Sequence, residues 1–198
     1  MEDIQLSPHF LLSEFCNNWR GGEIEQRNWE IGSSSPYIDN MKLLCTSILE
    51  PLRKRYMSSV KIASGFRFAE QKEDGTWWGL DVAIRTPRQQ KGYDNRSQHT
   101  RGSAADIHVD GIKDRDVFEW LAYHCPSPFG QVIYEVSGRS VWVHISIPGW
   151  RIPLTGGGLI YGEVMDAYQD SLGRWCYKKI AQIDPWKQRE VWLARTAR

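Results

Sequence analysis

His99, Asp106 and His144 have side chains that could together bind a metal ion if the fold brings them to one place. A histidine and an aspartate seven residues apart are common in any protein, and a histidine on an apolar strand is often an ordinary core residue. Residues 104–109 and 141–147 have strand-like patterns, however, so the three side chains could meet on one sheet face. Two imidazoles and one carboxylate leave one position of a tetrahedral zinc ion open, as in catalytic zinc sites.

A longer pattern surrounds these three residues. The sequence SQHTRGSAAD at 97–106, followed by WVH at 142–144, resembles the zinc D-Ala-D-Ala carboxypeptidase and L-Ala-D-Glu endopeptidase family. The upstream sequence IASGFR at 62–67 is similar to the Ser-Gly-Tyr-Arg element of that family. Two further segments, PHF at 8–10 and QVIYE at 131–135, are similar to its phage- or prophage-type branch.

The resemblance covers about residues 7–148, in the right order, and leaves out residues 149–198. It implies an α+β fold of the hedgehog/DD-peptidase type, with a small antiparallel sheet and flanking helices around a zinc cleft. It also implies that His99, Asp106 and His144 bind Zn2+ and that the protein cleaves peptidoglycan, as bacterial relatives and phage lysins do. A site with one carboxylate keeps a net positive charge, which suits the polarisation of a water molecule.

The same resemblance assigns roles to other motif residues. Arg67 corresponds to an arginine that binds the substrate carboxylate or stabilises the anionic intermediate, and a guanidinium suits both tasks. An exposed salt bridge is the alternative for this residue. Ser97 and Gln98 are expected at the substrate, although they could instead only shape the loop. Gly102 and Ala104 are expected to be small because the chain must turn tightly between two ligands.

Glu135 is the candidate general base. Many relatives place a glutamate three residues before the last histidine ligand, where this chain has a valine. If residues 137–140 form a turn, Glu135 lies opposite Trp142 and diagonal to His144, about 7–8 Å away at the backbone. That separation suits a carboxylate that reaches a zinc-bound water. A structural salt bridge, for instance to Arg139, is the alternative. A register slip of one residue would turn Glu135 to the wrong face.

The order of predicted elements indicates an α+β fold. The expected helices are a short one from about residue 13, one over 39–56 kinked by Pro51, and one over 114–123. The expected strands cover 60–64, 104–109, 131–136 and 141–147, the last two joined as a hairpin. The stretches 17–36 and 69–98 are expected to be irregular.

Beyond Pro148 the sequence changes character. Apolar runs at 159–165 and 175–180 predict a second hairpin, and residues 184–195 a short terminal helix. We expect a zinc peptidase domain over residues 1–150 and an extension over 151–198 that packs on it, because bare strand edges invite aggregation. The glycine run at 156–158 makes a mobile tail the competing view.

Composition narrows the function classes. The 198 residues include 25 Lys+Arg and 24 Asp+Glu, with 41% hydrophobic and 12% aromatic residues, which excludes a disordered chain. A net charge of +1 argues against a nucleic-acid partner. No apolar run approaches the ~18 residues of a membrane helix, so no membrane partner is expected. Four cysteines without a Cys-x-x-Cys pair predict buried free thiols.

The start of the chain, Met1-Glu2-Asp3, leads into no apolar segment, so we expect no secretory signal peptide. With the resemblance, this predicts synthesis in the cytoplasm and action on peptidoglycan stem peptides at the cell wall or periplasm, with phage-mediated release as one route. The protein would be a monomer or bind a phage assembly partner. The alternative function is a non-catalytic, metal-containing wall-binding or phage structural module. Which stem-peptide bond is cut stays open.

Overall fold

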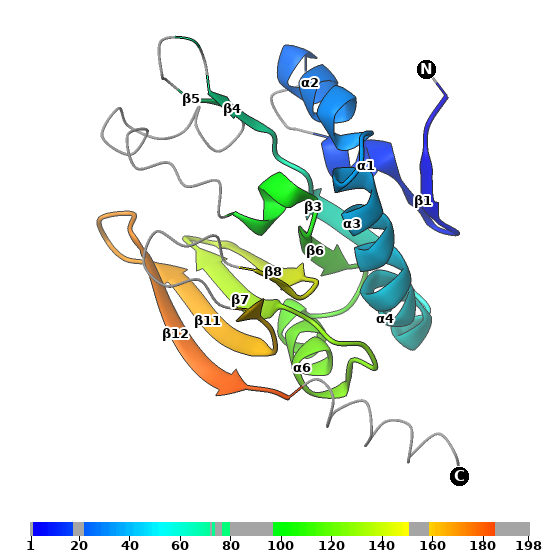
Figure 1. Ribbon diagram of the computed structural model, residues 1–198. Helices are drawn as coiled ribbons and strands as arrows, with labels where there is room; N and C mark the ends of the chain where they lie inside the picture. The colour runs from blue at the N-terminus through cyan, green and yellow to red at the C-terminus, as the bar shows by residue number, and fades with distance from the viewer. Residues whose placement is uncertain are drawn as a thin grey trace.

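A computed structural model of the chain describes residues 2–17, 22–71, 73, 77–79, 97–150 and 159–184. Its centre is a mixed sheet of six strands in the order β12-β11-β7-β8-β6-β3 (Figure 1). Their bounds, in that order, are Trp175–Gln182, Glu163–Gln169, Gln131–Ser137, Ser140–Ser146, Ala104–Val109 and Val60–Ser64. The predicted α+β class is confirmed. The sheet is mixed, however, and larger than the small antiparallel sheet that the sequence led us to expect.

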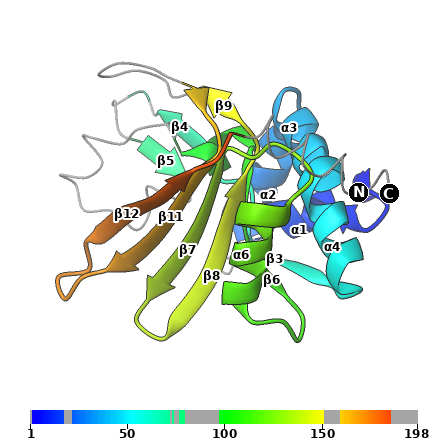
Figure 2. The ribbon, with the colours of Figure 1, turned by 90° about the horizontal axis from the view of Figure 1, so that it is seen from below.

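The parallel pair in this sheet is β7 with β11, and chain direction explains it. The strand β8 ends where β7 begins, since Gly130 N–H bonds the Ser146 carbonyl. The strand β11 starts at that same end, with Glu163 N–H bonded to the Gly130 carbonyl, and so runs alongside β7 in the same direction. The hairpin β11–β12, predicted from the apolar runs, therefore extends the central sheet (Figure 2).

Helices flank the sheet. They are α1 (Leu12–Cys16), α2 (Gly22–Gly32), α3 (Tyr37–Leu44), the π-helix η1 (Cys45–Leu49), α4 (Glu50–Tyr56), the 3-10 helix η2 (Gln98–Arg101) and α6 (Asp114–His124). The segments α3, η1 and α4 follow one another without a break, where the sequence predicted one kinked helix. Pro51 has no N–H for the Ser47 carbonyl, and the turn widens just before it.

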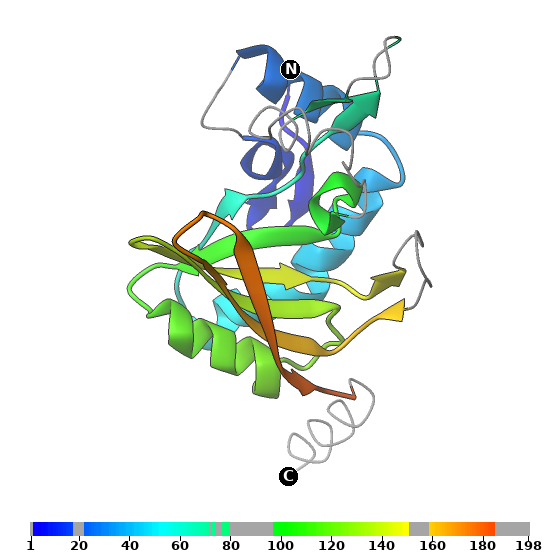
Figure 3. The same cartoon turned by 90° about the vertical axis from the view of Figure 1, so that its left-hand side faces the viewer.

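The two faces of the sheet have different surroundings. One face is apolar and forms the main core with α6, α3, η1 and α4. Figure 3 shows α6 beneath the sheet on this side. The opposite face, which we call the site face, carries chemically reactive and aromatic side chains. By strand register its members include Asp106, His144, Trp142, Glu135 and Ala167. The alternation along each strand thus separates the core from the candidate site residues.

The helix α2 corrects the prediction of an irregular segment over 17–36. Its sequence has a weak apolar pattern, and contacts distant in sequence stabilise it. The buried Asn28 donates to the Cys16 carbonyl (3.2 Å) and accepts from the Phe68 N–H (3.0 Å). A helix that depends on such tertiary hydrogen bonds leaves little trace in local sequence periodicity.

Three two-stranded sheets complete the described structure. They are β1 (Gln5–Ser7) with β2 (Phe10–Leu11), β4 (Ala69–Gln71) with β5 (Trp77–Gly79), and β9 (Gly149–Trp150) with β10 (Leu159–Ile160). The pair β4–β5 corrects the start of the segment predicted to be irregular over 69–98. Residues 80–96, the glycine run at 156–158 and residues 185–195 of the predicted terminal helix lie outside the described residues.

All four cysteines are free, and three are buried, as predicted. Burial raises the pKa of Cys16 to about 12 and that of Cys125 to about 11, so these thiols stay protonated at neutral pH. Cys176 differs from the prediction because it is partly exposed on β12. None of the helices in the described ranges has the length and apolar character needed to cross a bilayer.

Candidate metal centre

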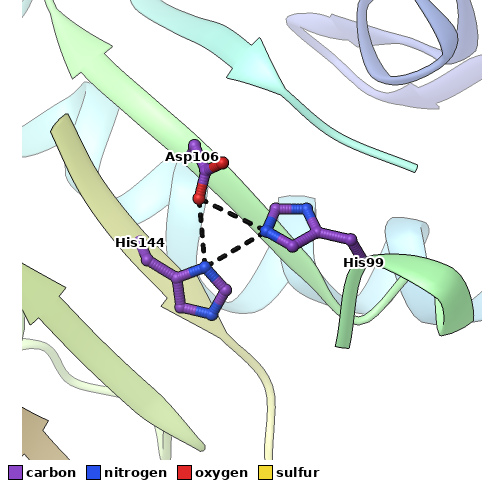
Figure 4. A group of neighbouring side chains, drawn as sticks. All are labelled: His99, Asp106 and His144. Carbon is purple, nitrogen blue, oxygen red and sulfur yellow. Dashed lines mark hydrogen bonds and ion pairs between the residues drawn. The ribbon is translucent and has the colours of Figure 1, made fainter. Parts of the chain in front are cut away.

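His99, Asp106 and His144 converge from three elements, η2, β6 and β8 (Figure 4). Asp106 lies directly opposite His144 in the antiparallel β6–β8 pair, so the sheet register places these two side chains together. His99 approaches from the 3-10 turn that precedes β6. All three are buried, with exposed fractions of 5% for His99, 7% for Asp106 and 6% for His144. The structure therefore brings together the three predicted ligands.

Gly102 makes the turn between His99 and β6. Its φ is +67°, in the left-handed region that favours glycine, and a Cβ there would lie 2.6 Å from the Tyr37 carbonyl oxygen. Two backbone hydrogen bonds close the turn, from Gly102 N–H to the His99 carbonyl (3.1 Å) and from Ser103 N–H to the Gln98 carbonyl (3.0 Å). The expectation that glycine is needed here is confirmed.

The three inner ligand atoms form a nearly equilateral triangle. His99 Nε2 lies 3.2 Å from His144 Nδ1, His144 Nδ1 lies 3.0 Å from Asp106 Oδ1, and His99 Nε2 lies 3.3 Å from the same oxygen. Ligands of a tetrahedral ion at 2.0–2.2 Å are about 3.3–3.6 Å apart. The cluster therefore has almost the dimensions of three corners of such a site.

The outer hydrogen bonds of the three side chains determine which atoms face inward. His99 Nδ1 lies 2.8 Å from the Gly65 carbonyl, and His144 Nε2 lies 3.1 Å from Gln98 Oε1. Each outer nitrogen donates to an oxygen, which assigns the tautomers and leaves lone pairs on His99 Nε2 and His144 Nδ1. With Asp106 Oδ1, three acceptors then face one another. A cation relieves that repulsion, so the cluster suits a metal ion.

No family model, curated protein or solved structure matches this chain. The donor atoms themselves therefore indicate the class of ligand. Two imidazole nitrogens with one carboxylate oxygen suit a divalent transition metal, and zinc accepts this set. The three corners leave a fourth position for water or substrate, which distinguishes catalytic sites from closed structural ones.

Electrostatics favour the metal-binding forms of the ligands. Burial lowers the pKa of His99, and the Arg67 guanidinium lowers it further, so this imidazole is neutral at pH 7. Burial by itself would raise the pKa of Asp106. The neighbouring imidazoles of His99 and His144 and the charge of Arg67 nevertheless hold that pKa well below its usual range. A neutral imidazole beside an ionised carboxylate is the state that binds a cation.

Glu135 lies on the site face in the predicted register. It is opposite Trp142, and its neighbour at position 133 is opposite His144, so Glu135 is diagonal to His144. Burial raises the pKa of the Glu135 carboxyl, Asp106 adds to this, and His144, Arg67 and the Trp142 indole partly offset it. Within the described range 97–150, Glu135 forms no ion pair with Arg139, the alternative raised by the sequence.

Arg67 contacts one of the candidate ligands. Its Nη2 donates to Asp106 Oδ2 (2.8 Å) and its Nε donates to Ser64 Oγ (2.8 Å). The guanidinium is therefore placed beside the metal cluster, with about a quarter of the side chain exposed. In this position Arg67 provides a hydrogen-bond donor for the second carboxylate oxygen of Asp106. Its contact with a substrate carboxylate stays a prediction.

Gln98 and Ser97 have contacts that the sequence did not specify. Gln98 is buried beside the cluster and accepts from His144, while the Ser97 carbonyl accepts the N–H (3.2 Å) and the hydroxyl (2.7 Å) of Thr100. The only sequence feature that indicated a role for Gln98 was its position in the motif next to His99. The Gly65 carbonyl that orients His99 is a backbone atom, which side-chain types do not reveal.

Proposed function

We propose that the protein is a zinc-dependent peptidoglycan peptidase of the hedgehog/DD-peptidase fold that hydrolyses an amide bond of the stem peptide. The observation that carries the proposal is the triangle of His99 Nε2, His144 Nδ1 and Asp106 Oδ1, with every ligand oriented by an outer hydrogen bond. The motif resemblance over about residues 7–148 supplies the substrate class. A D-Ala-D-Ala carboxypeptidase and an L-Ala-D-Glu endopeptidase are the two forms of this activity.

Bound zinc supplies Lewis acidity, which polarises a water molecule and the scissile carbonyl. Glu135 accepts a proton from the attacking water and then passes it to the leaving amine. Its raised pKa suits this exchange, because a carboxyl with a higher pKa both accepts and returns a proton more evenly near neutral pH. The half-buried position of Glu135 on the same sheet face as His144 supports this role.

Besides the metal ion, the guanidinium of Arg67 contributes positive charge to the site. Its guanidinium holds Asp106 Oδ2 in place, and its partly exposed surface suits a contact with a substrate carboxylate or with the anionic intermediate. The ion pair also keeps Asp106 ionised. Arg67 thus has a positioning role toward the ligand and a binding role toward the substrate.

Incubation with purified peptidoglycan, with and without a chelator, tests the function. We expect soluble fragments in the presence of zinc, none with the chelator, and recovery when zinc is restored. Mass spectrometry of the fragments distinguishes a released terminal D-alanine from a cut between L-alanine and D-glutamate. His144→Ala is the matched control because it removes one ligand. Tight binding to peptidoglycan without any released fragment would refute the proposed enzymatic function and support the alternative of a non-catalytic wall-binding module.

A further inference from the structure

The site face carries a second group of side chains that the proposed hydrolysis does not use. Ile133, Met165 and Ala167 form a small apolar cluster separate from the main core. Among the described residues, the partly buried apolar side chain packed against this cluster is Trp175, from the strand β12. The main core lies on the opposite face of the sheet, so this cluster does not stabilise the helices.

Three aromatic rings extend from this cluster. Trp142 and Trp175 meet edge to face, with centroids 5.8 Å apart and planes at 79°, and Tyr177 lies 6.2 Å from Trp175 with planes inclined by 31°. Ala167 lies between Glu135 of β7 and Tyr177 of β12 in the register, and Trp175 packs against the cluster that contains it. Tyr177 is 58% exposed. We call Trp142, Trp175 and Tyr177 the aromatic platform.

The aromatic platform begins beside the metal centre. Trp142 is two residues from His144 on β8, about 7 Å along the strand, and is directly opposite Glu135. One row of paired residues crosses the sheet from β8 to β12, a distance of about 14 Å, and consists of Trp142, Glu135, Ala167 and Tyr177. A ligand that reaches from the metal centre to Tyr177, at the far end of this row, is therefore longer than a dipeptide.

The surroundings of the platform favour a ligand that contains an uncharged ring with one apolar face and polar groups at its edge. Gln169 is opposite Trp175 in the β11–β12 ladder and accepts the Ser137 hydroxyl at 2.7 Å, which places polar groups beside the rings. Farther along the same face, Lys179 and Glu163 lie 3.7 Å apart and balance each other in charge. Aromatic faces bind apolar C–H surfaces, and the amide and hydroxyl suit hydroxyl groups.

We propose that the aromatic platform binds a pyranose ring of the glycan strand that carries the stem peptide, an inference that rests on the proposed function. The C–H face of the sugar stacks on Tyr177 and Trp175, while the attached peptide extends past Trp142 toward Glu135 and the metal centre. The peptidase then prefers peptides that are still attached to glycan over free stem peptides. The resemblance to known peptidases does not reach β11 or β12, which supply two of the three rings.

Calorimetric titration of the whole protein with peptide-free N-acetylglucosamine oligosaccharides tests the platform directly. Tyr177→Ala and Trp175→Leu should raise Kd about 2- to 12-fold, because they remove ring stacking, and Tyr177→Phe should bind like the wild type. Tyr168→Ala is the matched control, since Tyr168 is 52% exposed on the opposite face of the same hairpin. No binding by the wild type, or equal weakening by Tyr168→Ala, would overturn the proposal.

Hydrolysis separates this proposal from the proposed function. With glycan-attached peptide as substrate, Tyr177→Ala should raise KM by a similar factor and leave kcat unchanged. With the free stem peptide it should change neither constant. Equal effects on both substrates would refute glycan binding by the platform but would leave the proposed peptidase function intact. Oligosaccharide binding that depends on Tyr177, without hydrolysis of either substrate by the wild type, would refute the peptidase and keep the platform.

Discussion

Asp106 and His144 face each other directly across the β6–β8 ladder, with 3.0 Å between Asp106 Oδ1 and His144 Nδ1. Strand register alone places these two ligands, so they need no special loop. His99 is different, because it reaches the cluster from a short 3-10 turn whose shape depends on Gly102. The integrity of the candidate metal centre therefore depends most on that turn.

Gly102→Ala should destabilise the protein more than Gly138→Ala. Both glycines have positive φ, +67° and +59°, but a Cβ at 102 would meet the Tyr37 carbonyl at 2.6 Å, while one at 138 meets nothing within 4 Å. We expect Gly138→Ala to lower the free energy of unfolding by about 1–2 kcal/mol and Gly102→Ala by at least ~1 kcal/mol more. Urea denaturation measures both, and equal losses would contradict the role of the close contact.

Glu135→Gln should lower kcat about 10²- to 10⁴-fold and leave zinc content unchanged, because Glu135 is a proposed base and not a ligand. Peptidoglycan hydrolysis and metal analysis measure the two effects. Asp166→Asn is the matched control. Asp166 lies on β11, the strand next to β7, but its side chain is on the opposite face of the sheet from Glu135 and forms an ion pair with Arg115. Hydrolysis by Glu135→Gln at the wild-type rate would remove Glu135 from the mechanism.

The sequence predicted the parts of the structure that depend on local pattern. Alternating and apolar runs correctly predicted β3, β6, β7, β8 and the β11–β12 hairpin. Pro51 predicted a disturbed helix, and the structure has the π-helix η1 directly before α4. The three candidate ligands were predicted from the motif resemblance, with which the ligand preferences of zinc agree. The hairpin register placed Glu135 because strand pairing has a period of two.

What the sequence missed depends on contacts distant along the chain. The helix α2 was not predicted because buried hydrogen bonds of Asn28 stabilise it, and these partners are at positions 16 and 68. The parallel pairing of β11 with β7 follows from where the chain re-enters the sheet, which composition does not reveal. The orientation of His144 by Gln98 needs the geometry of η2 against β8.

Gln98→Leu should weaken zinc binding about 10- to 100-fold, because it removes the acceptor that holds the His144 ring and its tautomer. Gln98→Glu keeps an acceptor oxygen and should bind zinc at least as well as Gln98→Leu does. Competition with a chromophoric chelator measures the affinities. Gln26→Leu, on the exposed side of α2, is the control and should match the wild type. Wild-type affinity in Gln98→Leu would show that the His144 contact does not orient the ligand.

The metal-free protein should lose stability as the pH falls below about 6.5, the pKa of an unperturbed histidine. Burial lowers the pKa of His99 in the folded state, so between that lowered pKa and 6.5 the unfolded chain binds more protons. Stability therefore rises with pH across this window and levels off above it. Thermal unfolding in a chelator, followed from pH 7.5 to 5, should show the midpoint falling below pH 6.5.

His99→Gln should flatten this dependence, because the variant has no imidazole to protonate on unfolding. His124→Gln, at the exposed end of α6, should keep the slope of the wild type. Zinc should steepen the fall in the wild type, since protons compete with the metal for the ligand nitrogens. An unchanged slope in His99→Gln would mean that burial of this imidazole does not couple folding to pH, and that another group titrates in the window.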